Sequence, residues 1–250
     1  MQVTRRQSWQ TLAALAAQAG IASPETGEGV VKLVVLDVGG TIIQDRGDVP
    51  EAMIDSCAHH GIRITPEDVA PLRGASKREV VRRFVEQRAP KGADREKLAA
   101  EIYAEFNAQV IAAYKGVPPI DGAEAAFVKM RKAGLGLVAS TGFGRAVADS
   151  IFQRLKWQDH FVTVITGDDV TLGRPAPYMI FHAMEASKTA SVAQAIAVGD
   201  TPLDMQAAGN AGVRGIGVLS GAGTEEKLRA EKAAEILKSV AMLPDWLRIG

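Results

Sequence analysis

The chain has 250 residues, of which 47% are hydrophobic and 23% charged, a composition typical of a globular protein with a large core. Basic and acidic residues number 29 each, so net charge gives no reason to expect a nucleic-acid or membrane partner. Cys57 is the single cysteine, which excludes an internal disulfide and a cysteine-based metal cluster. No apolar run approaches the length that crosses a bilayer.

The first 29 residues are interpreted separately from the rest of the chain. Arg5 and Arg6 precede an apolar stretch at residues 12–19, an order that resembles a twin-arginine export signal. Gln18 interrupts this short stretch, which favours a plain N-terminal extension with a linker at residues 23–29. We therefore expect a cytoplasmic protein, with export through this N-terminus as the alternative.

A buried strand is predicted where an apolar, β-branched run at residues 34–36 leads into Asp37. Gly39, Gly40 and Thr41 follow it and predict a loop. Ligands of α/β proteins bind outside the C-terminal ends of such strands, so Asp37 is a candidate functional residue. An ordinary turn is the alternative, because aspartate and glycine are common turn residues.

Residues 49–114 carry helical patterns and no convincing buried strand. Helices are predicted to start at Pro50, at Thr65 and at Ser76, and a longer helix is predicted over 94–113. Ser76 and Glu79 have the spacing of a capping box, followed by an apolar stripe at helical spacing. The pattern indicates a small helical module inserted between two strands.

Strands and helices alternate in the second half of the chain. Strands are predicted at 135–140, 161–165, 195–199 and 215–218, and helices at 145–155, 178–187 and 202–210. Repeated strand–helix units form parallel sheets with right-handed crossovers, so we predict an α/β fold with a doubly wound, Rossmann-like parallel sheet.

The ends of these strands bring five polar groups to one edge of the predicted sheet. They are Asp37, Thr141 with the amide of Gly142, Arg174, Asp200 and Asp204. Asp37 and Asp200 are hard oxygen ligands that suit Mg²⁺, and Arg174 adds positive charge for an anionic group. Taken singly, each has an ordinary explanation as a helix cap or a surface charge. Together they favour a site for a phosphoryl group.

Four motifs resemble those of the haloacid dehalogenase (HAD) superfamily and occur in the same order. They are Asp37-x-Gly39-Gly40-Thr41, Ser140-Thr141-Gly142, Arg174-Pro175 and Gly199-Asp200-Thr201-x-x-Asp204. The resemblance covers residues 30–220. It implies a core domain of residues 30–45 and 116–250, with an α-helical cap domain of residues 46–115 inserted, after the extension of residues 1–29.

The resemblance also implies roles for the strand-end residues. Asp37 is the nucleophile that becomes an aspartyl-phosphate, while Thr141 and Arg174 bind the phosphoryl group. Mg²⁺ is the implied cofactor, held by Asp37, Asp200 and the carbonyl of Gly39, with Asp204 supporting the site. The helical cap closes over the substrate and excludes water.

Gly39 is the main departure from the phosphatases of the superfamily, which have an acid–base aspartate at this position. A placed acid contributes about 10²–10⁴-fold to rate, so its loss means either crippled catalysis or a leaving group that needs no such acid. Phosphonoacetaldehyde hydrolases (phosphonatases) also carry a small residue here. They use a cap lysine to form an imine with the substrate aldehyde.

The segment 73–77 is similar to the phosphonatase segment that carries this lysine, with Lys77 at its position. The start of a helix and nearby arginines are expected to lower the pKa of Lys77, as an imine-forming amine requires. An ordinary solvated lysine is the alternative. The chain departs from phosphonatases at Val80, Phe143 and Arg73, where they have histidine, tyrosine and methionine.

We expect a Mg²⁺-dependent hydrolase that cleaves the carbon–phosphorus bond of a small carbonyl phosphonate through an imine on Lys77. Gly74, Gly142 and Phe143 are the expected substrate contacts, and Arg73 is a candidate for binding a substrate carboxylate. One alternative is a phosphomonoester phosphatase of the phosphoglycolate phosphatase or β-phosphoglucomutase type. Another is a non-catalytic protein that binds a phosphoryl ligand. Neither nucleic acid nor membrane is an expected partner, and a homodimer through the cap is suggested by analogy alone.

Overall fold

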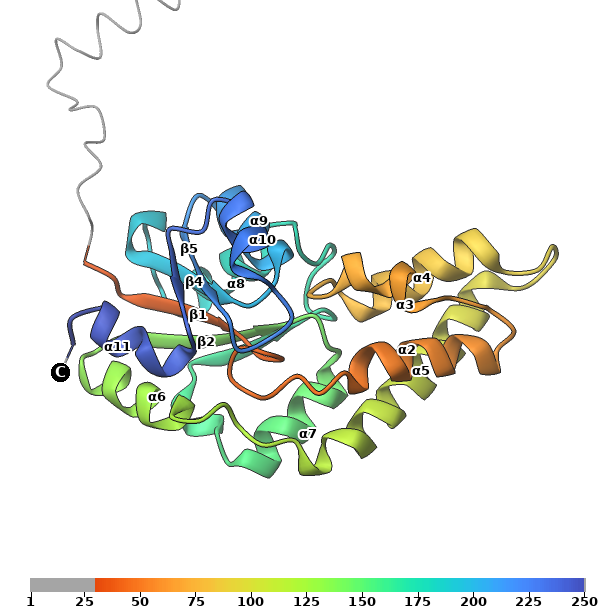
Figure 1. The fold of residues 1–250 in the computed structure, drawn as a ribbon, viewed down its shortest axis with the longest axis horizontal. Coiled ribbons are helices and arrows are strands. Elements are labelled where there is room, and N and C mark those ends of the chain that lie inside the picture. Colours follow the sequence, from red (N-terminus) through yellow and green to blue (C-terminus); the bar gives the residue numbers. More distant parts are fainter. Residues whose placement is uncertain (1–29, 250) are drawn as a thin grey trace, which may run out of the picture.

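In the computed structural model, which describes residues 30–249, a parallel six-stranded sheet has the order β3-β2-β1-β4-β5-β6 (Figure 1). The strands are β1 (Leu33–Asp37), β2 (Gly136–Thr141), β3 (Thr163–Thr166), β4 (Ala195–Gly199), β5 (Arg214–Val218) and β6 (Glu235–Leu237). The predicted α/β fold with a doubly wound parallel sheet is confirmed.

Strand β1 lies in the middle of the sheet, paired with β2 on one side and β4 on the other. All five of its residues are buried, and their side chains alternate between two apolar layers. Val34 and Leu36 belong to one layer, and Leu33 and Val35 to the other. Both faces of the sheet therefore need a helical cover, which explains why the strand is continuously apolar.

Helices supply that cover on both faces of the sheet (Figure 1). One face carries α6 (Ala123–Lys132) and α7 (Arg145–Leu155), and the other carries α8 (Tyr178–Ala186) and α9 (Pro202–Ala211). Two short helices, α10 (Glu225–Ala230) and α11 (Leu243–Trp246), complete the C-terminal part. None of the helices within residues 30–249 is long and apolar enough to cross a membrane.

Four of the five α-helices between β1 and β2 in the chain extend away from the sheet (Figure 1). They are α2 (Asp48–His59), α3 (Pro66–Val69), α4 (Lys77–Arg88) and α5 (Arg95–Ala113). Helix α5 packs against α2 and α4, and Met53, Phe84 and Phe106 are buried among them. Below we call α2–α5 the helical module; its definition as a cap domain of residues 46–115 stays a prediction.

The two chain segments that join the helical module to the sheet run side by side as an antiparallel stem. The backbone N–H of Gln44 donates to the carbonyl of Pro118 at 3.0 Å. The N–H of Ile120 donates to the carbonyl of Ile42 at 2.9 Å, and Ile43 forms a bridge with Pro119. The chain therefore enters and leaves the helical module at one place.

The predicted capping box at Ser76 is wrong, although Ser76 is the N-cap residue of α4. Within the described part of the chain its Oγ is buried without a hydrogen-bond partner. The Glu79 carboxylate does not turn back to the start of its own helix, because its Oε1 accepts a hydrogen bond from the N–H of Gly173 at 2.6 Å. The hydrogen bond from Gly173 thus takes the place of the capping contact that Glu79 would make with Ser76.

Other sequence predictions differ in smaller ways or lie outside the structure. Helices α6, α10 and α11 and strand β6 were not predicted, and β3 begins at Thr163 rather than at residue 161. Val162 just before β3 is 53% exposed, so its apolar side chain does not belong to a buried strand. The arginine pair and apolar stretch of residues 4–19 fall outside the described residues, and the interpretation of this stretch stays a prediction.

Candidate active site

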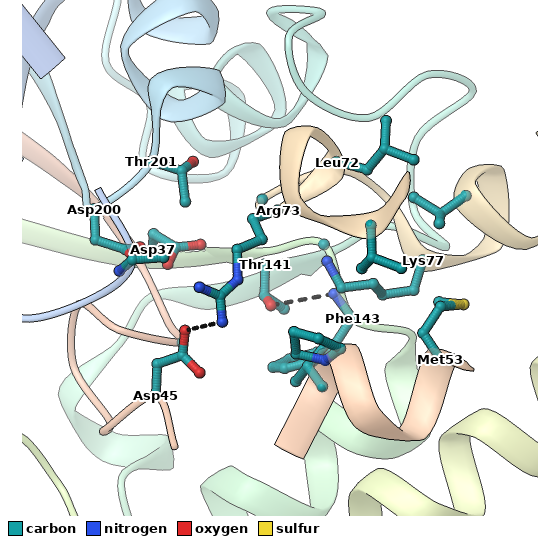
Figure 2. A pocket seen from close by; sticks show the side chains of 18 of the residues that line it. Asp37, Asp45, Met53, Leu72, Arg73, Lys77, Thr141, Phe143, Asp200 and Thr201 are labelled. Carbon is teal, nitrogen blue, oxygen red and sulfur yellow. Dashed lines mark hydrogen bonds and ion pairs between the residues drawn. The ribbon is translucent and has the colours of Figure 1, made fainter. Parts of the chain in front are cut away.

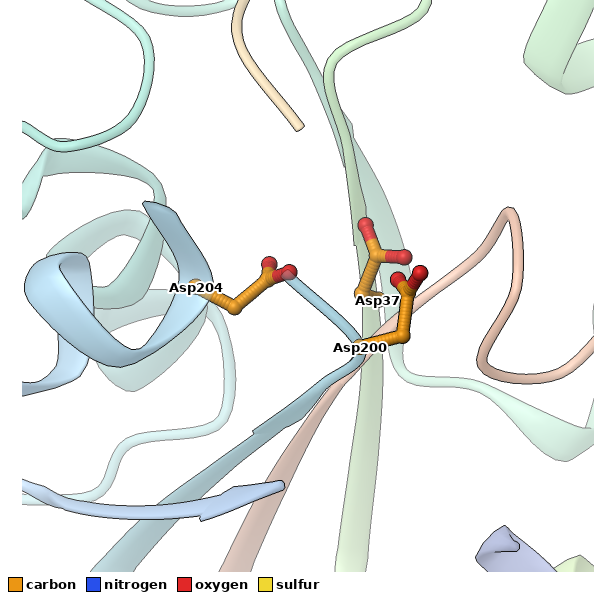
Figure 3. A group of neighbouring side chains, drawn as sticks. All are labelled: Asp37, Asp200 and Asp204. Atoms are coloured by element: carbon orange, nitrogen blue, oxygen red, sulfur yellow. The ribbon is translucent and has the colours of Figure 1, made fainter. Parts of the chain in front are cut away.

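Three carboxylates meet at the C-terminal edge of the sheet (Figure 3). Asp37 ends β1, Asp200 follows the neighbouring strand β4, and Asp204 lies in the first turn of α9. One oxygen from each lies within 4.8 Å of the others. Thr201 fixes Asp204, since its backbone N–H and hydroxyl donate to Oδ2 at 3.0 and 2.6 Å. The sequence prediction that these groups share one edge is met by the geometry.

Arg174 joins the carboxylates to the next strand. Its Nη1 lies 2.6 Å from Oδ1 of Asp37 and 2.9 Å from Oδ1 of Asp204. Its Nη2 donates to the carbonyl and the hydroxyl oxygens of Ser140, both at 2.8 Å. The planar guanidinium therefore spans two strands and α9 with one side chain, a geometry that the single ammonium of lysine lacks.

Burial dominates the electrostatics of this cluster. It raises the pKa of Asp37 to about 6, although Arg174 opposes the rise. It also raises the pKa of Asp200 well above the ordinary value, and the neighbouring charges of Asp37 and Asp204 add to the effect. A cation bound here would relieve the repulsion among buried carboxylates, and hard oxygen donors are the ligands that Mg²⁺ prefers. The three side chains thus fit a divalent metal ion.

Lys77 begins α4 and points into the same region while remaining buried. Its Nζ donates to the carbonyl of Ala75 at 2.9 Å and lies 5.9 Å from the centroid of the Phe143 ring. Its backbone N–H donates to the carbonyl of Gly142 at 2.9 Å, which ties the start of α4 to the end of β2. A solvated lysine is therefore excluded.

Desolvation by burial lowers the pKa of Lys77 to about 8, with Arg174 and Arg73 adding to the effect and Asp37 opposing it. The direction agrees with the sequence prediction, which rests on the helix N-terminus and nearby arginines. Burial is the larger cause. Arg78 is instead paired with Asp168 at 3.7 Å across the junction with the core.

A pocket lies between the helical module and the strand ends (Figure 2). It encloses about 660 Å³, the open space at its mouth included. Every predicted site residue except Asp204 lines it: Asp37, Gly39, Arg73, Gly74, Lys77, Thr141, Gly142, Phe143, Arg174 and Asp200. The structure thus gathers residues from four strand ends and from the helical module around one cavity.

The start of α4 fits closely against the core at glycine positions. Gly74 has a φ of +87°, and a Cβ added there would lie 2.5 Å from Oγ1 of Thr201. A Cβ at Gly142 would overlap the carbonyl oxygen of Ala75. These contacts explain why both positions are glycine and why Lys77 reaches the pocket.

Gly39 has no such restriction. A Cβ built there would have the ring of Phe143 as its nearest contact, at 3.8 Å, an ordinary van der Waals distance. The position that carries an acid in phosphatases of the superfamily therefore has room for a side chain. The lack of a side chain at Gly39 is therefore a property of this sequence and is not required by the packing around it.

Three residues of the site that make polar or aromatic contacts have no role of their own in the sequence prediction. Asp45 lines the pocket and pairs with Arg73, Oδ2 to Nη2, at 3.0 Å. Tyr114 lines it too and meets Phe143 edge to face, with ring centroids 5.6 Å apart. Ser140 holds Arg174. Asp45 and Tyr114 carry no local motif, whereas Ser140 stands next to Thr141 at a strand end and was open to prediction.

Comparison with known proteins adds to this geometry. The family model described as haloacid dehalogenase-like hydrolase matches residues 34–218. The chain belongs to this family. The HAD-like assignment agrees with the predicted resemblance, and it supports hydrolase activity for the pocket at the strand ends.

Named relatives of this HAD-like chain include a phosphonoacetaldehyde hydrolase from Bacillus cereus. It is 30% identical over 230 residues, covering 85% of this chain and 84% of the relative. A phosphonoacetaldehyde hydrolase-like protein from Oleispira antarctica has a similar fold, with a TM-score of 0.75 at 20% identity, covering 88% and 92% of the two chains. A β-phosphoglucomutase from Clostridium difficile gives a TM-score of 0.73 at 16% identity, covering 87% and 96%.

Proposed function

We propose that the protein hydrolyses the carbon–phosphorus bond of a small carbonyl phosphonate. The observation that carries the proposal is the buried Lys77, with its lowered pKa, in the pocket that also contains Asp37. Gly39 in place of an acid fits the same reaction, because an imine makes protonation of the leaving group unnecessary. The similarity to phosphonoacetaldehyde hydrolase agrees with it.

In the first step the neutral amine of Lys77 attacks the substrate carbonyl carbon. One proton is taken up from solvent, the carbonyl oxygen leaves as water, and a protonated imine joins Lys77 to the substrate. The final imine hydrolysis returns this proton. A pKa of about 8 leaves roughly one tenth of this amine neutral at pH 7. Phe143 lies close enough to contact the bound carbon chain.

In the second step a carboxylate oxygen of Asp37 attacks phosphorus. The electron pair of the carbon–phosphorus bond moves into the iminium, which becomes an enamine on Lys77. The phosphoryl group is left on Asp37 as an acyl phosphate. Arg174, Thr141 and the amide of Gly142 lie at the same edge and would hold its oxygens.

Water then completes both halves of the reaction. Attack of water on phosphorus releases inorganic phosphate and restores the Asp37 carboxylate. Protonation of the enamine at carbon, followed by hydrolysis of the resulting imine, releases the dephosphonylated carbonyl compound and free Lys77. Asp37, Asp200 and the carbonyl of Gly39 would hold Mg²⁺, which neutralises charge between the nucleophile and the phosphonate.

Borohydride trapping tests this proposal. With phosphonoacetaldehyde and borohydride, we expect a stable adduct that peptide mapping places on Lys77, and steady phosphate release without borohydride. Lys77→Arg keeps the charge and should abolish both. Absence of an adduct and of phosphate release with every carbonyl phosphonate would contradict the proposal.

A phosphomonoester phosphatase is the second candidate, supported by the similar fold of β-phosphoglucomutase and by the buried carboxylates. It predicts turnover of phosphate esters that does not depend on Lys77. A protein that only binds a phosphoryl ligand is the third candidate. It predicts binding of inorganic phosphate with no turnover of either substrate class.

A further inference from the structure

We propose that the preferred substrate is a ketone phosphonate with an apolar group on the carbonyl carbon, which the enzyme turns over more efficiently than the aldehyde. This inference rests on the proposed function and specifies its substrate class. It concerns the part of the pocket that lies beyond Lys77 as seen from Asp37, where Met53 is placed in Figure 2.

The direction of the bound substrate follows from its two reacting ends. Its phosphorus must lie near Asp37, and its carbonyl carbon must lie next to Nζ of Lys77. The remaining substituent on that carbon then points to the pocket wall beyond the lysine. In an aldehyde this substituent is a hydrogen atom, which contacts less of that wall than an alkyl group does.

That wall is apolar, and several of its side chains come from the helical module. Val80 lies one helical turn after Lys77 on α4, so the two side chains share a face of the helix. Met53 of α2 and Val69 of α3 line the same pocket, as does Leu72. Val80 is 4% exposed and Met53 is 1% exposed. Such a surface binds hydrocarbon better than water.

The charges of the pocket favour an alkyl group over a carboxylate as that substituent. Arg73, the candidate for binding a substrate carboxylate, is already paired with Asp45 at 3.0 Å. Arg174 is held by Asp37 and Asp204. Lys77 has to be neutral to form the imine. A second anionic group would therefore meet cations that are already compensated, whereas an alkyl group meets a matching wall.

The reaction of such a substrate balances with water alone. A 2-oxoalkylphosphonate and one water give a methyl ketone and inorganic phosphate, through the same imine and aspartyl-phosphate. Each methylene group buried against the apolar wall should raise kcat/KM by about fourfold until the space is filled.

A series of four substrates tests the inference in the unmodified protein with Mg²⁺. It consists of phosphonoacetaldehyde and the 2-oxopropyl, 2-oxobutyl and 2-oxopentyl phosphonates. We expect kcat/KM for phosphate release to rise along the series, and each active ketone to give a borohydride adduct on Lys77. If kcat/KM stays constant or falls along the series, the inference is overturned. If the aldehyde is still turned over and forms an adduct on Lys77, the proposed function stands. No turnover and no adduct with any of the four overturns both.

Two matched variants test whether the preference for longer ketones depends on the pocket wall at Val80. Val80→Thr keeps the shape of the side chain and replaces a methyl with a hydroxyl at the wall. Val85→Thr makes the same change on the same helix, at a buried position outside the pocket. We expect the ratio of kcat/KM for the pentyl ketone to that for the aldehyde to fall at least threefold in Val80→Thr only. An equal ratio in both variants would contradict the role of Val80.

Discussion

The guanidinium of Arg174 lies 2.6 Å from the carboxylate of Asp37, although 137 residues separate them in the chain. The pair is buried and shares Nη1 with Asp204, so it links the end of β1 to α9. Ser140 holds the other end of the guanidinium. The candidate nucleophile is thus oriented by a network that reaches across the sheet edge.

Removing this guanidinium should destabilise the fold. Arg174→Met leaves buried carboxylates without their partner, so we expect the free energy of unfolding to fall by about 3–5 kcal/mol in urea denaturation at pH 7. Arg229→Met is the control, because Arg229 forms an exposed pair with Glu225 and should contribute less than about 1 kcal/mol. Equal losses in the two variants would contradict the structural role of Arg174.

Restoring an acid at Gly39 should create phosphatase activity. The site has space for a Cβ, and a carboxyl group there can protonate an alkoxide leaving group. We expect Gly39→Asp to raise kcat/KM for ethyl phosphate by about 10²–10⁴-fold over Gly39→Asn. The gain for p-nitrophenyl phosphate should be much smaller, since its leaving group needs no proton. Identical rates for the two variants would rule out this interpretation.

The reaction rate should follow the titration of Lys77. With a pKa of about 8, the neutral fraction rises about fivefold between pH 7 and pH 8 and levels off above pH 9. We expect kcat/KM for phosphonate hydrolysis to show this rise. A profile flat from pH 6 to pH 9 would remove Lys77 as the imine-forming group.

Stability should depend on pH through the same residue. The pKa of Lys77 is about 8 in the folded state and 10.5 as an ordinary lysine, so the unfolded chain binds the extra proton between these values. The free energy of unfolding, relative to Lys77→Met, should therefore rise from pH 8 to pH 10.5, by on the order of 3 kcal/mol in total. Urea denaturation of both proteins at pH 7.5 and 10.5 measures the difference, and a difference of zero would contradict the burial of Lys77.

Close packing at Gly142 should be required for imine formation. A Cβ there overlaps the Ala75 carbonyl, next to the hydrogen bond that holds the start of α4. We expect Gly142→Ala to slow borohydride trapping on Lys77 at least tenfold. Gly116→Ala is the control, because a Cβ at Gly116 meets open space. Normal trapping in Gly142→Ala would show that the contact is dispensable.

The sequence predicted the sheet and most of the site because both depend on local patterns. Apolar runs that end in Asp37, Thr141 and Asp200 identify strands and place polar groups at their C-terminal ends. Parallel pairing then brings those strand ends to one edge of the sheet, independently of the conformation of the loops. Helices α6, α10 and α11 and strand β6 were not predicted, and none of them contributes a residue to the pocket.

Long-range contacts explain the rest of the differences. Glu79 has the correct spacing for a capping box, but the N–H of Gly173 competes for its carboxylate. Asp45 looks like a loop residue until Arg73 is placed beside it. Such pairings join segments whose proximity depends on how the helical module sits on the sheet, and no local pattern encodes that.

The antiparallel stem formed by residues 42–44 and 118–120 has a mechanical consequence. Because the two connections are hydrogen-bonded to each other, any rotation of the helices against the sheet has to pivot beyond Gln44 and Pro118. Lys77 lies on one side of that pivot and Asp37 on the other. In the proposed reaction both groups must reach one substrate, so bond cleavage would require the helical module to be seated against the sheet.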